Sequence, residues 1–466
     1  MRSFLKEYNY DWRFWSILDN AVKSFRGTEK EFQQTLNYIP AFRVTTEALL
    51  ALGGPGRELL KATATYFENI LKARERGKKI ALITYNFSPA ILYAFDSIVP
   101  YCLEGLSAFY TAAWRNGVAE SLDYCCEVGF TETSCSGQRV ALGPILAGVA
   151  ERPDFILCST AGVCDSNANS FAFASAYLDI PFCQMNYPPT LVEDRSVEYH
   201  REDFKRAIEF MEEQTGERLD PEKLEIVCKE SLKQDELICE IQEYQALSPC
   251  PVPSLYSLLL YDIRVLFSGA EVGTDILKSM LDVVKDNAAK GIAGNGFEKV
   301  RGFFFYIDHY CNQMRYWLWL KNNGVSHIGT MMTDFWQVDA PYAKGREEEG
   351  YSVDTSSLDS MIDSLAAQTS RMPMVKQIRG PYDAPHMWLD DTLGVAELMK
   401  PDFLAYIGTM GCRNTWGSVK LIAKDTERAG YPTIILYGDS FDDRVEPADT
   451  MINKLDEFLQ VRGIWK

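Results

Sequence analysis

Two cysteines stand at matching points of two short segments that lie almost 250 residues apart in the chain. The first segment reads PDFILCSTAGVC and ends at Cys164; the second reads PDFLAYIGTMGC and ends at Cys412. A cysteine in a loop between a strand and a helix lies where parallel sheets bind ligands, and helix amides there favour a thiolate or another anion. For either cysteine alone, a structural role in a tight loop is the alternative.

A third cysteine has a similar setting. Cys135, in ETSCSGQRVALG, lies between turn-like residues and an apolar-periodic helix. Three single cysteines from distant loops can hold a [4Fe–4S] cluster and leave one iron free of protein sulfur, which is the open-site arrangement of a catalytic metal. Spacing alone does not bring them together, so this hypothesis depends on the fold.

Other metal and nucleotide motifs are missing from the sequence. The chain has 12 cysteines but no Cys-x-x-Cys pair, and its 4 histidines are scattered without a zinc spacing. It has no Gly-x-x-x-x-Gly-Lys-Ser/Thr, and GIAGNG (291–296) follows no clear strand, so we expect it to be a loop.

The bulk composition predicts a large cytoplasmic globular protein. A net charge of −18 argues against nucleic acid as the main partner, because phosphate binding requires basic surface. The start lacks the apolar run of a secretory peptide, and the most apolar window carries Asp262 and Arg264, so we expect neither export nor a membrane span. In a reducing cytosol the cysteines do not form a disulfide framework, and most are expected in the core.

The elements that position the cysteines follow a repeated pattern. Around Cys164, a strand at 155–159, a loop, a helix from about 167 to 177 and the strand IPFCQM form a βαβ unit. Around Cys412, FLAYIG (403–408), a loop, a helix from about 415 to 428 and PTIILYGD repeat that unit. KIALITYNF and GFFFYI (302–307) are expected to be strands, and ILYAFDSIV a helix.

The fold class is therefore α/β with parallel sheets, and the chain divides into four regions. We expect a helical N-terminal extension (1–78, including GTEKEFQQTL), a first α/β domain (79–200), a helical region (201–298) and a second α/β domain (299–466).

From about residue 79 to 460 the sequence resembles the iron–sulfur catalytic subunits, of the larger-subunit type, of the 2-hydroxyacyl-CoA dehydratase and benzoyl-CoA reductase family. The resemblance rests on four segments in order, which begin KIALITYNFSPAILYAFDSIVPYCLEG, ESLDYCCEVGFTETSCSGQRVALG, DFILCSTAGVCDSNANSF and IGTMGCRNTWGSVKLIAKDTERAGYPTIILYGDSFDDRVEP. It implies two flavodoxin-like (Rossmann-like) domains and a [4Fe–4S] cluster bound by Cys135, Cys164 and Cys412.

The resemblance also implies partners and a reaction. It implies an acyl-CoA or aroyl-CoA substrate, a related iron–sulfur subunit in a heterodimer, and a separate ATP-dependent activator that donates electrons. In a dehydratase, one-electron reduction of the thioester gives a ketyl radical that loses water; in a benzoyl-CoA reductase, electrons and protons break the aromaticity of the ring. The dehydratase, a lyase, is the preferred reading. The reductase, a double-cubane [8Fe–9S] reductase, a non-catalytic electron-transfer subunit and a redox-inert α/β protein stay open.

Two catalytic candidates follow from the same resemblance. Glu104 stands where the family has a glutamate near the cluster, and a solvated helix-cap role is the alternative. Thr84, with Tyr85 and Asn86, stands at the end of the first strand, where polar side chains could hold a substrate oxygen.

Four further cysteines and the C-terminal segment carry additional predictions. Cys125, Cys126, Cys158 and Cys183 could supply ligands to a double cubane, although Cys158 and Cys183 sit in apolar runs typical of strand cores. The residues after PTIILYGD, Asp442 to Arg444, are expected to form a structural turn before a last helix with one apolar face, made of Met451, Ile452, Leu455, Phe458 and Leu459.

Overall fold

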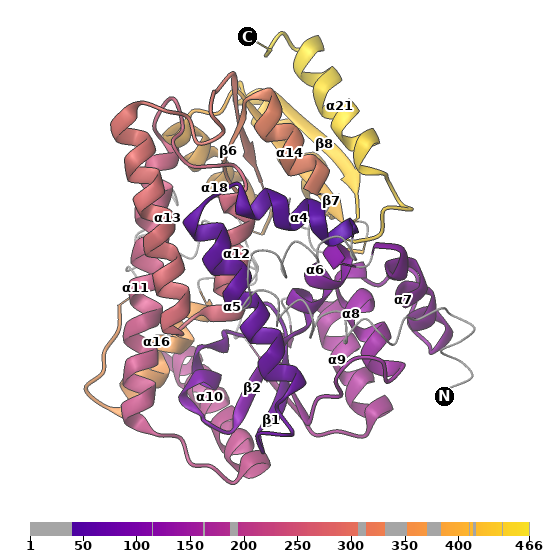
Figure 1. The fold of residues 1–466 in the computed structure, drawn as a ribbon, viewed down its shortest axis with the longest axis vertical. Coiled ribbons are helices and arrows are strands. Elements are labelled where there is room, and N and C mark those ends of the chain that lie inside the picture. Colours follow the sequence, from indigo (N-terminus) through magenta and orange to yellow (C-terminus); the bar gives the residue numbers. More distant parts are fainter. Residues whose placement is uncertain are drawn as a thin grey trace.

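Two four-stranded parallel sheets form the framework of the molecule (Figure 1). The computed structural model describes residues 40–113, 115–161, 164–186, 194–305, 314–330, 352–370, 384–409, 411–412, 416–439 and 441–465. The first sheet has the order β2-β1-β3-β4, and its strands are Lys79–Ile83 (β1), Ile98–Cys102 (β2), Phe155–Ala161 (β3) and Phe182–Asn186 (β4).

The second sheet repeats this order as β6-β5-β7-β8. Its strands are Val300–Phe304 (β5), Val325–Thr330 (β6), Phe403–Thr409 (β7) and Thr433–Gly438 (β8). Every pairing in both sheets is parallel. The α/β fold with two parallel sheets is confirmed, and the shared order is the start of the flavodoxin-like one.

The central strands read as continuous apolar runs because helices cover both of their faces. All but the first residue of β1 and all of β7 are buried, which is the pattern of parallel strands. In each sheet the strand order reverses between its two central strands, β1 and β3 or β5 and β7. Crevices that bind ligands open outside the carboxyl ends of strands at such points.

Helices connect and cover the strands of each half. In the first half, the short 3-10 helix Pro89–Ala94 (η1) follows β1. Three helices lie between β2 and β3 in the chain: Leu103–Ala113 (α6), Arg115–Glu127 (α7) and Ser136–Leu146 (α8). Asp165–Leu178 (α9) crosses from β3 to β4. In the second half they are Met314–Asn323 (α14), Leu358–Ser370 (α16), Ala384–Met399 (α18), Val419–Arg428 (α20) and Ala448–Val461 (α21).

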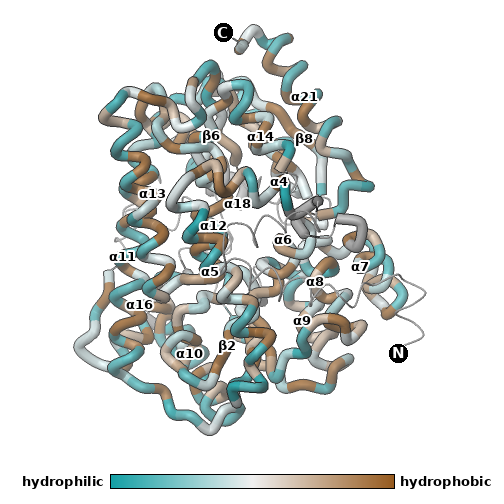
Figure 2. The backbone as a smooth tube through the Cα atoms, in the orientation of Figure 1, coloured by the Kyte–Doolittle hydropathy of each residue, from teal (hydrophilic) through white to brown (hydrophobic). Residues whose placement is uncertain are grey.

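A helical region links the two halves along one side of the molecule. Its helices are Asp194–Thr215 (α10), Pro221–Gln245 (α11), Tyr256–Phe267 (α12) and Glu271–Lys290 (α13). Figure 1 shows α11 and α13 running side by side past both sheets. The surface of these long helices alternates between hydrophilic and hydrophobic residues, as expected for helices with one face on the core (Figure 2). GIAGNG lies outside helices and strands, as predicted.

The expected N-terminal helices are present where the structure describes them. Pro40–Leu50 (α4) and Gly54–Leu71 (α5) precede β1, and α5 packs against α13. The segment GTEKEFQQTL lies outside the described residues. No helix among those described is long and apolar enough to cross a membrane. The division into four regions given above stays a prediction.

One helix prediction was wrong, and two edge strands, β2 and β6, were not predicted. The run ILYAFDSIV forms η1 and then enters β2, which contains Pro100. A proline is tolerated there because β2 is the edge strand, with one side free of ladder hydrogen bonds. The other edge strand not foreseen is β6, whose sequence VSHIGT carries too few apolar residues to signal a buried strand.

Candidate functional site

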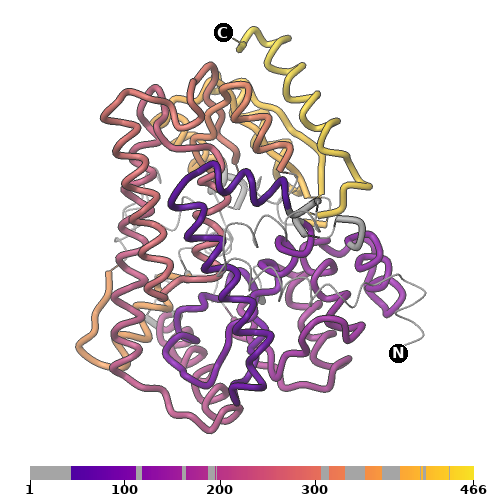
Figure 3. The backbone as a smooth tube through the Cα atoms, in the orientation of Figure 1, coloured from indigo at the N-terminus to yellow at the C-terminus, as the bar shows by residue number. Residues whose placement is uncertain are grey.

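The candidate residues gather at the carboxyl ends of central strands. Thr84 to Asn86 follow β1, Cys164 follows β3, and Cys412 follows β7. These are the two switch points of the sheets, where parallel α/β proteins bind ligands. Figure 3 shows that the segment from α6 to α9 lies beside the ends of β7 and β8, far away in the sequence.

Cys135 and Cys164 each cap the N-terminus of a helix. Cys135 precedes α8, and Cys164 precedes α9 with its sulfur accepting the backbone N–H of Asn167 at 3.5 Å. The amides at a helix N-terminus favour a negative sulfur. Both cysteines, like Cys412, are partly exposed.

The three cysteine loops touch one another. The backbone N–H of Cys135 donates to the hydroxyl of Ser166, two residues after Cys164, at 3.2 Å. On the other side, a Cβ on Gly411 would stand 2.6 Å from the Cα of Cys135, so only glycine lets the Cys412 loop approach this closely. The second domain thereby brings its cysteine against the first domain's cysteine loop.

The thiols lie close enough for the charge of one to influence the acidity of another. Burial is the largest cause that raises the pKa of Cys135. The negative charges of Asp439, Cys164 and Cys412 raise it further. Burial is also the largest cause that raises the pKa of Cys164. The negative charges of Cys412 and Glu104 raise this pKa further. Three thiolates this close repel each other, so they stay ionised together only if positive charge is placed between them.

Glu104 lies at the start of α6 and connects to both first-domain cysteine loops. Its carboxylate accepts the backbone N–H of Tyr85 at 2.9 Å on Oε2. On Oε1 it accepts the amides of Asn167 at 3.0 Å and Gln138 at 3.3 Å. These two are the third residues of the helices that Cys164 and Cys135 cap. The carboxyl is therefore held between two strand–helix junctions.

The surroundings of Glu104 raise its pKa to a value near neutral pH. The side chain is only 3% exposed, and burial raises its pKa to about 7 against the opposing effect of its hydrogen-bond donors. The alternative of a solvated helix-cap glutamate is wrong. A carboxyl with this pKa can both hold and release a proton near neutral pH.

Thr84 is fully buried and is engaged within its own loop. Its hydroxyl donates to the side-chain oxygen of Asn86, whose amide donates to the carbonyl of Ser159 at 3.2 Å. This chain ties the end of β1 to β3. Near it, the buried Oδ1 of Asn167 accepts no hydrogen bond from the described residues.

The remaining candidate cysteines have other surroundings. Cys158 and Cys183 are buried in β3 and β4, as expected for strand-core residues. Cys125 donates to the carbonyl of Arg139 at 3.2 Å, and Cys126 lies 3.5 Å from the guanidinium of Arg139. Arg139 also donates to the carbonyls of residues 132 and 134, which holds the loop before Cys135.

No group of three histidine, cysteine or carboxylate side chains in the described part of the chain is arranged to hold a single metal ion. A mononuclear site needs all its ligands within about 2.3 Å of one ion, whereas a cluster of several irons takes thiolates that lie farther apart.

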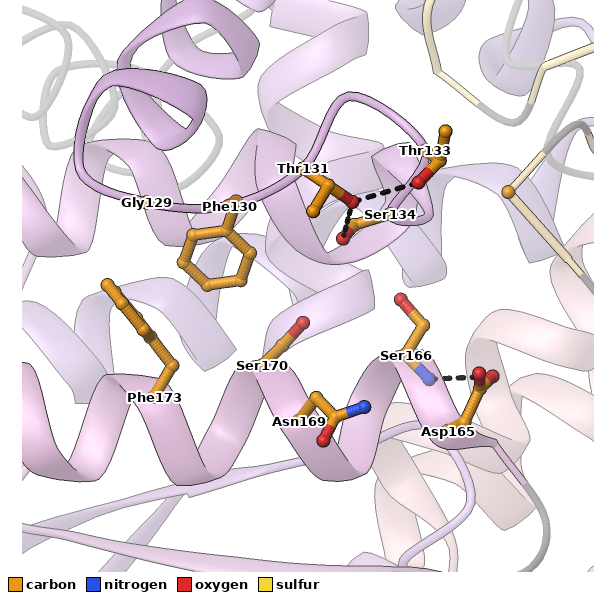
Figure 4. Close-up of a pocket in the computed structure, with 11 residues that line it drawn as sticks. Gly129, Phe130, Thr131, Thr133, Ser134, Asp165, Ser166, Asn169, Ser170 and Phe173 are labelled. Carbon is orange, nitrogen blue, oxygen red and sulfur yellow. Dashed lines mark hydrogen bonds between the residues drawn. The ribbon is translucent and has the colours of Figure 1, made fainter.

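A pocket of about 280 Å³ opens beside the cysteine loops (Figure 4). Ser134, Ser166 and Gly411, each within two residues of one cysteine, line it, and the rings of Phe130 and Phe173 close its other end with centroids 4.6 Å apart. The described lining carries hydroxyls, an amide and one carboxylate but no basic side chain.

Three residues of the site, Gln138, Asn167 and Asp439, were not predicted from the sequence. Gln138 and Asn167 could have been suspected, because the third residue of a capped helix points its side chain back towards the cap. Asp439 gave no such signal, since it acts on residues about 300 positions away.

The chain matches the family model described as 2-hydroxyglutaryl-CoA dehydratase, D-component, over residues 84–459. It is 28% identical over 244 residues to the (R)-phenyllactyl-CoA dehydratase alpha subunit of Clostridium sporogenes, covering 50% of this chain and 59% of that protein. It is 26% identical over 249 residues to the (R)-2-hydroxyisocaproyl-CoA dehydratase alpha subunit of Clostridioides difficile, covering 51% and 60%. The similarity thus spans about three-fifths of each relative.

Proposed function

Because this chain belongs to the 2-hydroxyglutaryl-CoA dehydratase D-component family, we propose that it is the [4Fe–4S]-cluster subunit of an ATP-activated dehydratase of (R)-2-hydroxyacyl-CoA thioesters. The observation that carries the proposal is the meeting of three thiols at the switch points of two sheets, beside a buried carboxyl of raised pKa. The two relatives, named as alpha subunits of dehydratases for (R)-phenyllactyl-CoA and (R)-2-hydroxyisocaproyl-CoA, support this substrate class.

The chemistry of the donor set fits an iron–sulfur cluster. Cys135 and Cys164 have helix N-termini behind them, and the mutual repulsion of the three thiolates is relieved by iron between them. A cluster held by three protein thiolates keeps one iron open and, when bound, supplies the low-potential electron that the thioester needs. The double-cubane alternative would need further sulfurs. Cys158 and Cys183 are buried within strands, and Cys125 and Cys126 contact Arg139, so the single cubane is preferred.

Glu104 would handle the proton of the elimination. Loss of the 2-hydroxyl as water requires one proton at that oxygen, and a carboxyl with a pKa of about 7 is protonated in a large fraction of molecules near neutral pH. After donating, the carboxylate is stabilised by the amides of Gln138 and Asn167. It can then accept a proton from the substrate in the next step.

Thr84 and Asn167 would position the substrate. The hydroxyl of Thr84 donates its one hydrogen to Asn86, so a substrate hydroxyl would bind there by donating to the lone pairs of the Thr84 oxygen. The Oδ1 of Asn167 is a buried acceptor with a free lone pair among the described residues, and it suits a substrate hydroxyl.

The partners follow from the family and the relatives. We propose a related iron–sulfur subunit, by analogy with relatives that are named alpha subunits, and a separate ATP-hydrolysing activator. The four-region domain division given above is part of the same proposal. Membership in a dehydratase family favours water elimination over ring reduction by a benzoyl-CoA reductase.

Iron and sulfide analysis of the anaerobically purified chain tests the proposal. We expect about four irons per chain in the wild type, and a strong loss in Cys135→Ala, Cys164→Ala and Cys412→Ala. Cys183→Ala, which alters a strand-core cysteine, is the matched control and is expected to keep its iron. A chain that binds no iron under these conditions refutes the cluster, and about eight irons favours the double cubane.

Turnover then tests the reaction. With activator, ATP and partner subunit present, we expect dehydration of an (R)-2-hydroxyacyl-CoA and no reduction of benzoyl-CoA. The opposite preference would assign the chain to the ring reductases.

A further inference from the structure

The loop after β8 binds directly to the N-terminus of α8, across the boundary between the two halves. Asp439 follows β8 and is partly buried. Its Oδ1 accepts the hydroxyl of Ser136, the residue next to Cys135, and the backbone N–H groups of Phe441 at 3.1 Å and Asp442 at 3.0 Å. One carboxylate oxygen thus orders its own loop and holds the neighbour of a cysteine in the other half.

A second contact reinforces the first. The backbone N–H of Phe441 also donates to the hydroxyl of Ser136 at 3.2 Å. The ring of Phe441 lies 3.4 Å from the position that a Cβ on Gly137 would take, and the sulfur of Cys135 lies equally close to that position. The aromatic ring therefore packs beside the cysteine sulfur from the second half.

The loop is fixed at its far end by charge. Arg444 binds both oxygens of Asp442, at 2.8 and 2.9 Å, and donates to Asp123 of α7 at 2.9 Å. Gly411, adjacent to Cys412, closes the opposite side of the Cys135 loop. Residues of the second half therefore contact the Cys135 loop on two sides.

We infer that Asp439 is a positioning residue that sets the separation of Cys135, in the first domain, from Cys412, in the second. The inference rests on the proposed function, because the fixed separation matters for a centre shared by both domains. Its physical basis is independent of the cluster. Among the described residues, one oxygen of Asp439 joins the end of β8, the 441–442 turn and Ser136. Its removal leaves the hydroxyl of Ser136 and the amide of Asp442 without this acceptor, and it takes one of two acceptors from the amide of Phe441.

Hydrogen–deuterium exchange on the iron-free full chain tests this geometry directly. In Asp439→Ala, the amide of residue 442 should exchange about tenfold faster or more, because its acceptor is gone, whereas the amide of residue 441 keeps Ser136 as an acceptor and should accelerate less. Ser136→Ala should accelerate exchange at residue 441 alone. Asp439→Asn keeps an oxygen that accepts from the same donors and should stay within about twofold of the wild type.

Thiol cross-linking of the same iron-free variants reports the separation of the cysteines. A short bifunctional maleimide, with peptide mapping, should link Cys135 to Cys412 at a sharply reduced rate in Asp439→Ala but not in Asp439→Asn. In the iron-loaded chain, Asp439→Ala should lose iron to a chelator about 10- to 100-fold faster, as is typical when an outer-shell partner of a metal ligand is removed.

Asp425→Ala is the matched control. Asp425 lies in the same half, and among the described residues its side chain pairs only with the exposed Arg428, at 2.8 Å. Unchanged exchange and cross-linking in both Asp439→Ala and Ser136→Ala overturn the inference, as does equal damage in Asp439→Asn. A wild-type chain without iron would overturn the proposed cluster, yet the exchange and cross-linking results would still decide the role of Asp439.

Discussion

Replacing Glu104 by glutamine gives a pH-dependent change in stability that follows from its burial. In the folded chain the carboxyl has a pKa of about 7, against an ordinary value of 4.5. Between these values the folded chain keeps a proton that the unfolded chain has released. The stabilisation from this proton is complete below pH 4.5 and is lost as the pH rises through about 7.

The magnitude follows from the difference between the two pKa values. At 1.36 kcal/mol per pH unit, the wild type should lose roughly 3 kcal/mol of unfolding free energy through this group between pH 4.5 and 8. Glutamine does not titrate, so the variant lacks this loss. Its amide oxygen can still accept from Asn167 and Gln138, but its N–H then faces the N–H of Tyr85, which costs about 1–3 kcal/mol at every pH.

Urea unfolding of the iron-free chain across this pH range measures the difference between the two proteins. We expect Glu104→Gln to be the less stable protein at pH 5 and to equal or exceed the wild type at pH 8. Glu58→Gln, on the exposed face of α5, is the control substitution. A difference between Glu104→Gln and wild type that stays constant from pH 4.5 to 8 would refute the raised pKa and, with it, the proton role proposed for Glu104.

Three further substitutions test how the site is held. Gly411→Ala places a Cβ 2.6 Å from the Cα of Cys135, so the free energy of unfolding should fall by about 1–3 kcal/mol and the iron content should drop. Gly54→Ala in α5, which has room for the added methyl group, is the control and should be tolerated. Arg139→Met removes two donors to loop carbonyls and should destabilise by about 2–4 kcal/mol in thermal unfolding; an unchanged melting temperature would contradict this. Asp123→Ala breaks only the exposed ion pair with Arg444, so calorimetry should find a loss below about 1 kcal/mol, and a larger loss would show that this pair holds the halves together.

The local part of the site could be predicted from the sequence. Cys164 and Cys412 stand in βαβ units whose strands, loops and helices each carry their own signal, and the structure has both units where the pattern indicated. The last helix, α21, buries Met451, Ile452 and Leu455 on one face for the same reason. The periodicity of a single helix or strand is a local property, so it can be recognised from the sequence without knowledge of the fold.

The long-range part could not be predicted, because it depends on how the elements pack. Glu104 reads as a surface residue at the start of a helix, and only the junctions that carry Gln138 and Asn167 enclose it. The strand β2 was not predicted, because its first two residues belong to the run ILYAFDSIV that was expected to be a helix, and a short apolar run without a period favours neither form. Its pairing with β1, which fixes its identity, involves residues 19 positions away.

The two halves contribute unequally to the candidate site, although their sheets have the same strand order. The first half supplies two thiols, the buried carboxyl and its amide donors, all joined by direct hydrogen bonds. The second half supplies Cys412 and the loop of Asp439, whose contacts with the first half among the described residues include the Cys135 loop and the ion pair of Arg444 with Asp123. A small rotation between the halves would therefore move Cys412 relative to the other thiols while leaving Glu104 and its donors intact. On the proposed assignment, such a rotation would alter the binding of the cluster before it altered the proton chemistry. Damage to the second-half contacts should thus reduce iron content while the pH-dependent stability due to Glu104 persists.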